Sequence, residues 1–209
     1  MKYTNSIDIK QRIPLDILYD ALKMHLTEGI DDQRLKELAK LRFQGESGIW
    51  RTTNHIKAVL NDENIAPFLQ LHKDKLLTAI ETTDRNIILL AIINAHFPFQ
   101  YFIFTTLAAQ FRLQDEVNRQ LLSRLIGTKY TFNMASEKAM KVVLQHMIEA
   151  EVLQRIQLGV YAPTEPVVTK NAITADIWRE SFFINNPLWN RENTDDLIFE
   201  PYFRYIANA

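Results

Sequence analysis

The sequence predicts a mostly α-helical protein, and three observations support this class. Apolar residues recur at the spacing of one helical face over most of the 209 residues. Glycine occurs only five times, and the dipeptides typical of tight hairpin turns are scarce, which disfavours a multi-stranded sheet. Only residues 153–162 alternate around a glycine as strands do, so we expect one small β-hairpin in the C-terminal half.

The first 80 residues are expected to form a helical subdomain. Pro14 is suited to the start of a helix and Gly29 to its end. Asp31 or Asp32 can cap a second helix that ends near Gly45.

A hinge is expected directly after these two helices. Residues 45–48 contain two of the five glycines and are the best candidate for it. A short helix is then predicted to begin at Thr52 or Thr53, and a further helix to cover residues 66–80.

The central segment, residues 81–163, begins with a stretch that is apolar on nearly every helical face. Residues 87–93 and 99–108 would be long enough together to suggest a transmembrane hairpin. His96, Pro98 and neighbouring amides interrupt the stretch, and no basic cluster flanks one side. Two buried helices that meet at Pro98 are therefore the favoured interpretation, with the membrane hairpin as the alternative.

Further helices are predicted on both sides of the hairpin. One should cover residues 114–126 and end at Gly127, and the next should begin with Ser136 as its cap. The last segment, residues 164–209, should contain a helix at 174–184 and another after Thr194, packed on the core as an acidic, aromatic tail.

Composition excludes several classes of function. The chain has no Cys, so thiolate metal sites and Cys nucleophiles are excluded, and an intracellular, cytoplasmic location is expected. The first eight residues contain no apolar run that could act as a signal peptide. Phosphate-loop, dinucleotide, nucleophile-elbow and zinc-protease motifs do not occur, so we expect neither an enzyme nor a cofactor.

Two His-x-x-Glu pairs would each lie on one helix face, as metal ligands or an acid–base pair require. They are His25 with Glu28 and His146 with Glu149. A surface or helix-stabilising role is favoured, because neither pair has the partner motif that di-metal helical bundles use. His96 could likewise be a ligand, although a hydrogen-bonded histidine is commoner. No metal is expected, and a metal-dependent helical enzyme is the weakest alternative.

The helix that begins at Ser136, followed directly by the hairpin, has the order of a winged-helix element. Lys138, Lys141 and Gln145 form an outward row on that helix, suited to a DNA major groove. Arg155 and Lys129 could hold the DNA backbone. Against this, nine residues, 128–136, would separate the two helices, where a compact helix-turn-helix has three or four.

A second basic cluster surrounds residues 45–48. Its members are Lys36, Lys40, Arg42 and Arg51, which could contact nucleic acid or could form an ordinary solvated helix face. The chain has 24 basic and 25 acidic residues, so DNA binding should be modest and salt-sensitive.

Aromatic residues gather near the C-terminus, where they either pack on the chain's own core or dock a partner. The candidates for partner docking are Trp178, Phe182, Trp189 and Tyr202.

The order of these features resembles the small A component of bacteriophage exclusion (BREX) defence systems. The resemblance rests on residues 17–22, on 84–91 leading into 99–102, and on 136–144 leading into 149–153. It departs at Glu151, where the family pattern often has glycine. The resemblance implies a NusB-like helical bundle without catalytic residues that binds double-stranded DNA within a multi-protein phage-defence assembly.

The sequence therefore predicts a non-enzymatic DNA-binding or scaffolding component that works with other defence-system proteins. The alternative is a protein-interaction module that binds no nucleic acid and docks through its C-terminal aromatic segment.

Overall fold

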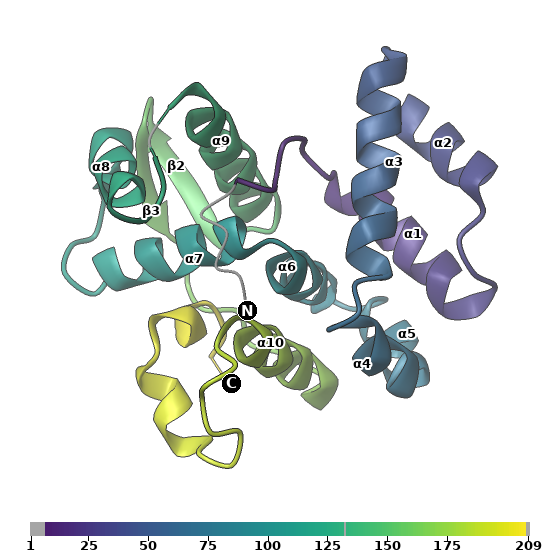
Figure 1. Cartoon of the computed structure of the whole chain (residues 1–209). Coiled ribbons are helices and arrows are strands. Elements are labelled where there is room, and N and C mark those ends of the chain that lie inside the picture. The colour runs from purple at the N-terminus through teal and green to yellow at the C-terminus, as the bar shows by residue number, and fades with distance from the viewer. Residues whose placement is uncertain (1–6, 132, 208–209) are drawn as a thin grey trace.

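The computed structural model describes residues 7–131 and 133–207, which form ten α-helices, two short 3-10 helices and a three-stranded antiparallel sheet (Figure 1). The predicted mainly α-helical class is thus confirmed. The helices are α1 (Leu15–Thr27), α2 (Asp32–Lys40), α3 (Glu46–Leu60), α4 (Ala66–Leu71), α5 (Lys73–Ala79), α6 (Arg85–His96), α7 (Pro98–Gln110), α8 (Arg119–Lys129), α9 (Met134–Glu149) and α10 (Ala172–Asn185), followed by the 3-10 helices η1 (Asp195–Phe199) and η2 (Pro201–Tyr205). The strands are β1 (Val117–Asn118), β2 (Leu153–Gln157) and β3 (Val160–Pro163).

The first two helices begin where their capping residues predict. Pro14 precedes α1, and Gly29 follows it with φ at +89°, a conformation that glycine adopts without strain. The side chain of Asp31 accepts hydrogen bonds from the backbone N–H groups of Gln33 and Arg34, which caps α2.

The predicted start of the next helix at Thr52 or Thr53 is wrong. Helix α3 begins six residues earlier than Thr52, at Glu46, with Gly45 in an extended conformation as its N-cap. The expected hinge is therefore mostly the first turn of a helix, and both threonines are buried inside that helix. The single helix predicted over 66–80 is divided at His72 into α4 and α5.

The apolar centre of the chain forms two helices that meet at Pro98, as predicted. Helices α6 and α7 are bent by 118° relative to each other, and residues 87–95 of α6 are all buried. Among the described residues no single helix has the length and hydropathy to cross a membrane, whereas the bent pair α6–α7 meets that criterion when taken together.

The second half differs from prediction around α8. This helix begins after β1 and continues through Gly127 to Lys129, so Gly127 does not end it. Helix α9 begins at Met134, because the side chains of Asn133 and Ser136 form a reciprocal capping box. Residues 130–133 alone separate the two helices, and the expected nine-residue separation is wrong.

The hairpin predicted at 153–162 is confirmed and is extended by a third strand. The sheet order is β1–β3–β2, and Tyr161 of β3 lies opposite Val117 on one side and Arg155 on the other. The hairpin turns at Gly159, whose φ is +77°. In chain order, this part is a strand, a helix, a short connection, a second helix and a two-stranded hairpin, all following α7.

The C-terminal aromatic residues pack on the chain itself. Trp178 of α10 stacks on Tyr202 of η2, with 4.4 Å between ring centroids and 9° between ring planes. Trp178, Phe182 and Tyr202 are at most 1% exposed, so the prediction that these three dock a partner is wrong: they fill the hydrophobic core. Trp189 is half-buried at its edge, against Phe182.

Candidate functional site

A groove lies where α8, α9 and the β2–β3 hairpin meet, and its volume is about 790 Å³. Helix α8 contributes polar side chains to its walls, and α9 and the hairpin contribute both polar and apolar side chains. The lining residues are Asn118, Arg119, Gln120, Ser123, Lys141, Leu144, Gln145, Ile148, Arg155, Leu158, Gly159, Val160 and Tyr161.

Helix α9 presents its polar row to this side of the molecule. Lys138, Lys141 and Gln145 are exposed, while the opposite face of the helix is buried in the core. Lys141 and Gln145 line the groove together with Arg155 of β2, and Lys138 lies one turn earlier on the same helix. The structure thus places three of the nominated residues, Lys141, Gln145 and Arg155, on one groove.

Two charged residues that the sequence analysis did not nominate lie at the groove: Arg119 lines it, and Glu137 contacts two of its lining residues. Arg119, in the first turn of α8, forms an ion pair with Glu137 of α9. The same carboxylate lies 3.3 Å from the Nζ of Lys141. The Glu137–Lys141 spacing of four residues was visible in the sequence, but the approach of Arg119 depends on how β1 and α8 fold against α9.

The carboxylate of Glu137 neutralises part of the local positive charge. Lys138 and Arg155 form no ion pair with any described residue. Three cations, Arg119, Lys141 and Arg155, line the groove, and no carboxylate is among its described lining residues. A polyanion that contacts α9 would therefore meet net positive charge.

The other nominated cations lie elsewhere. The ammonium group of Lys129, at the far end of α8, lies 5.0 Å from the ring centroid of Phe102. Arg42 is paired with Asp16 of α1. Lys36, Lys40 and Arg51 are exposed on α2 and α3, which Figure 1 shows on the opposite side of the molecule from α8 and α9.

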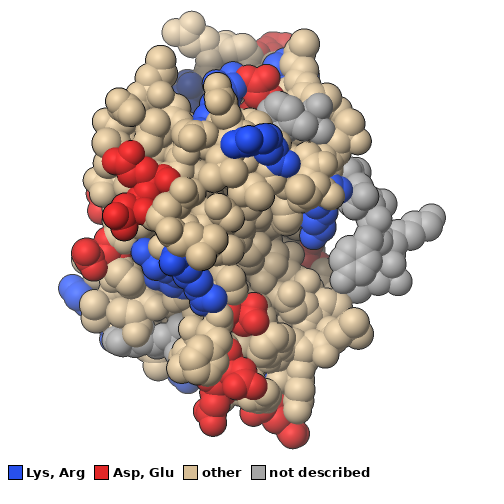
Figure 2. Space-filling view, turned by 90° about the vertical axis from the view of Figure 1, so that its left-hand side faces the viewer, with Lys and Arg blue, Asp and Glu red and all other residues tan. Residues whose placement is uncertain are grey.

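The surface in Figure 2 carries no continuous basic field. Lys and Arg side chains form separate groups over its upper and middle parts, and acidic side chains lie between them. Acidic residues gather at its lower end, the level at which Figure 1 shows the C-terminal segment. This distribution agrees with the near balance of charges in the sequence.

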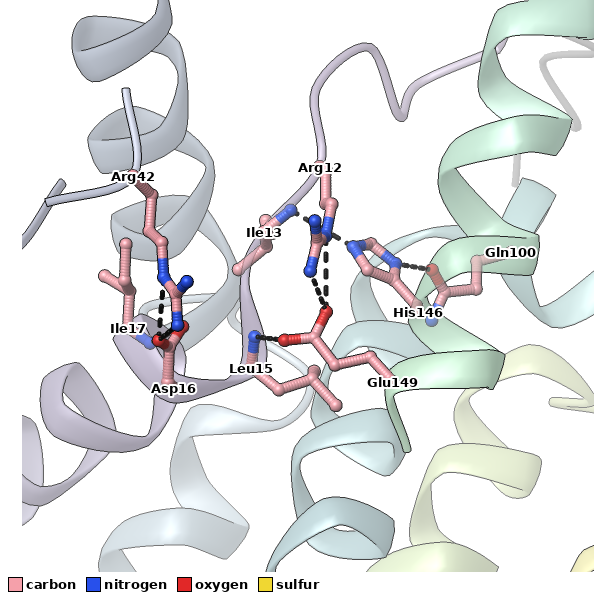
Figure 3. A network of polar contacts seen from close by, with 9 residues as sticks. All are labelled: Arg12, Ile13, Leu15, Asp16, Ile17, Arg42, Gln100, His146 and Glu149. Atoms are coloured by element: carbon pink, nitrogen blue, oxygen red, sulfur yellow. Dashed lines mark hydrogen bonds and ion pairs between the residues drawn. The ribbon is translucent and has the colours of Figure 1, made fainter. Parts of the chain in front are cut away.

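The second His-x-x-Glu pair binds the segment that leads into α1. The backbone N–H of Ile13 donates a 3.1 Å hydrogen bond to His146 Nε2, and His146 Nδ1 lies 2.8 Å from Gln100 Oε1 (Figure 3). Glu149 accepts hydrogen bonds from the backbone N–H of Leu15 and the guanidinium of Arg12. Both members of the pair therefore hold the N-terminal segment against α9.

Burial keeps His146 neutral. It lowers the pKa of the imidazole from 6.5 to about 3, and the positive charge of Arg12 acts in the same direction. Both ring nitrogens of His146 and both carboxylate oxygens of Glu149 are thus engaged in hydrogen bonds within the protein.

His25 and His96, the other two histidines considered as ligands, also have side-chain partners. His25 Nε2 lies 3.2 Å from the side-chain amide of Gln70, and Glu28 forms an ion pair with Arg34. His96 Nδ1 lies 2.7 Å from Asp62 Oδ2. Within residues 7–131 and 133–207, no group of three or more His, Asp or Glu side chains is arranged to hold a metal ion.

Comparison of the chain with protein-family models, with curated proteins and with solved structures gave no match.

Proposed function

We propose that the groove between α8, α9 and the β2–β3 hairpin binds double-stranded DNA and that the protein is a non-enzymatic component of a bacterial phage-defence complex. The observation that carries the DNA proposal is the convergence of Lys141 and Gln145 of α9 with Arg155 of the hairpin on one groove, with exposed Lys138 one turn earlier on α9. The defence-complex assignment rests on the resemblance in sequence layout to the BREX A component.

The order of elements supports a winged-helix interpretation. Strand β1, helix α8, helix α9 and the β2–β3 hairpin follow one another as in that element, and β1 pairs with β3. The short connection at residues 130–133 suits a compact helix-turn-helix. In such elements the second helix enters the major groove, which here is α9.

The side chains suit this docking. Gln145 can read a base edge, and Lys138 and Lys141 can contact bases or phosphates from the same row. Arg155 lies on the neighbouring hairpin, where it can contact the DNA backbone. Arg119 and the capped N-terminus of α8 open on the same groove, and helix N-termini favour phosphate.

Fluorescence anisotropy with a random duplex of about 30 base pairs tests the proposal at two salt concentrations. We expect binding that weakens with salt, because each neutralised phosphate releases a counterion. The variant Lys138→Glu/Lys141→Glu should lose binding and keep its fold. The matched control, Lys73→Glu/Lys75→Glu on α5, changes the same charge at a site that Figure 1 shows far from α9 and should bind as wild type. Equal binding by the two double variants would contradict the proposal.

A protein-interaction role is the second candidate, and exposed apolar residues of the C-terminal segment favour it. Ile198 is 63% exposed and Phe199 is 67% exposed, both in η1. The guanidinium of Arg112 donates a 2.6 Å hydrogen bond to the Phe199 carbonyl, which fixes this segment beside the end of α7. The absence of duplex binding even at low salt would favour this candidate, with Ile198 and Phe199 as its contact residues.

A further inference from the structure

A second cleft lies between α2 and the first turns of α3, and its volume is about 590 Å³. Its walls combine two lysines of α2 with an aromatic ring of α3. The lining residues are Lys36, Lys40, Glu46, Ser47, Ile49 and Trp50. Helices α2 and α3 lie on the side of the molecule opposite to the groove of α8 and α9 (Figure 1).

Trp50 is the exposed tryptophan of this chain. It is 63% exposed, whereas Trp178 is fully buried and Trp189 is half-buried. An indole has a large apolar surface that normally lies in a core or an interface. Its position on the wall of a cleft indicates a surface that a flat ligand can cover.

The charges at the cleft favour an anionic ligand. Lys36 and Lys40 are one helical turn apart, and neither forms an ion pair with another described residue. One carboxylate, that of Glu46, lines the cleft beside them, and exposed Arg51 follows Trp50 on α3. Nearby cations differ in this respect, since Lys57 is paired with Asp32 at 3.1 Å.

We propose that this cleft binds unpaired nucleotides, with a base stacked on Trp50 and the phosphates held by Lys36 and Lys40. Single-stranded nucleic acid is commonly bound in this way, by aromatic platforms beside a basic track, and every base offers a flat face for stacking. This cleft is a second nucleic-acid site, separate from the groove that binds duplex DNA in the proposed function, and it accepts single strands.

Anisotropy with a fluorescein-labelled oligonucleotide of about twelve thymidylates tests the proposal. We expect binding to wild type, a loss of between about 5-fold and about 100-fold in Trp50→Ala, and a smaller loss in Trp50→Phe, which keeps a ring for stacking. Lys36→Glu/Lys40→Glu should lose oligonucleotide binding and should lower its salt dependence. These residues are exposed, so thermal unfolding should match wild type.

The two sites can be separated with the reciprocal variant. Lys138→Glu/Lys141→Glu should lose duplex binding and keep oligonucleotide binding, and Trp50→Ala should do the reverse. Oligonucleotide binding without duplex binding in wild type would contradict the proposed function and support this site. Oligonucleotide binding that Trp50→Ala leaves unchanged, or no such binding, would overturn the site. Binding of a fluorescein-labelled acidic Glu-rich peptide to wild type but not to Trp50→Ala, in the absence of oligonucleotide binding, would assign the cleft to a protein partner.

Discussion

The imidazole of His146 in α9 accepts a 3.1 Å hydrogen bond from the backbone N–H of Ile13, which lies just before α1. Because Nε2 accepts, the neutral ring carries its proton on Nδ1, where Gln100 Oε1 accepts it at 2.8 Å. A second proton on Nε2 would face the Ile13 N–H donor. The contact therefore requires a neutral histidine and connects the helix of the proposed DNA-binding face to the N-terminal helices.

This requirement predicts a pH dependence of stability. The pKa of His146 is lowered to about 3 by burial, so below pH 6.5 the unfolded chain takes up a proton that the folded chain excludes. The contribution of neutral His146 to the free energy of unfolding is full above pH 6.5. It is lost as the pH falls from 6.5 towards 3, at about 1.4 kcal/mol per pH unit. Urea unfolding at pH 7.5 and pH 5 should show a larger loss for wild type than for His146→Gln, by about 2 kcal/mol.

The difference in stability loss between wild type and His146→Gln reports the titration of His146 separately from that of other buried groups. Burial raises the pKa of Asp8 to about 6, and its effect has the opposite sign because stability is lost as the pH rises from 3.8 towards 6. Asp8 is present in both proteins and cancels in the difference. An equal loss of stability in both would show that the imidazole is charged in the folded state.

Asp84 connects the start of α6 to the start of α10. Its carboxylate accepts hydrogen bonds from the backbone N–H groups of Lys170 and Asn171, at 2.8 to 3.0 Å, and from the hydroxyl of Thr174 at 2.8 Å. Burial opposes its charge, but these donors outweigh burial and hold the pKa of Asp84 below 3.8. The carboxylate thus holds the segment that leads into α10 from a distant part of the chain.

The change Asp84→Asn should lower the free energy of unfolding by about 2 to 3 kcal/mol, because an amide group replaces an acceptor among several donors. Urea unfolding at neutral pH measures the loss. Asp115→Asn, at an exposed position before β1, makes the same substitution and should leave the midpoint unchanged. Equal midpoints for both variants would show that Asp84 does not stabilise the fold.

The sequence predicted those helices whose ends carry strong local signals. Pro14, Gly29 and Asp31 mark the ends of α1 and α2 through backbone conformation and capping, which are local effects. The prediction failed where a local signal was ambiguous. Glycine is the N-cap of α3 at Gly45, whereas Gly127 lies within α8, so the residue type alone does not mark a helix end. Strand β1 is two residues long and exists through its pairing with β3, which no local pattern reports.

The candidate site divides in the same way. The row of Lys138, Lys141 and Gln145 follows from helical periodicity, so it was predictable before the structure. The ion pair of Arg119 with Glu137 depends on the packing of two helices. Composition alone could not predict the position of the C-terminal aromatic residues. Trp178 and its neighbours are equally suited to an interface and to the core that they occupy.

Gly159 allows the hairpin to turn beside α8. Its φ is +77°, and its carbonyl accepts a 2.8 Å hydrogen bond from the backbone N–H of Arg119. Gly159→Ala should cost about 1 to 2 kcal/mol in unfolding free energy, because an L residue is strained at this φ. Gly48→Ala in the first turn of α3 should be neutral or slightly stabilising, since helices favour alanine. Thermal unfolding of both variants tests this prediction. An unfolding midpoint of Gly159→Ala equal to that of wild type would contradict it.

Glu137 restrains the two cations that flank it, so its removal should strengthen duplex binding. In Glu137→Gln, Arg119 and Lys141 are free to contact phosphates and a repulsive charge is lost. We expect roughly fivefold tighter binding at low salt, from about 1 kcal/mol of charge interaction, and a steeper salt dependence. Anisotropy titrations with the random duplex measure both. Glu63→Gln, at an exposed position before α4, is the matched control and should bind as wild type. Weaker binding by Glu137→Gln would instead mean that the carboxylate positions the cations for DNA.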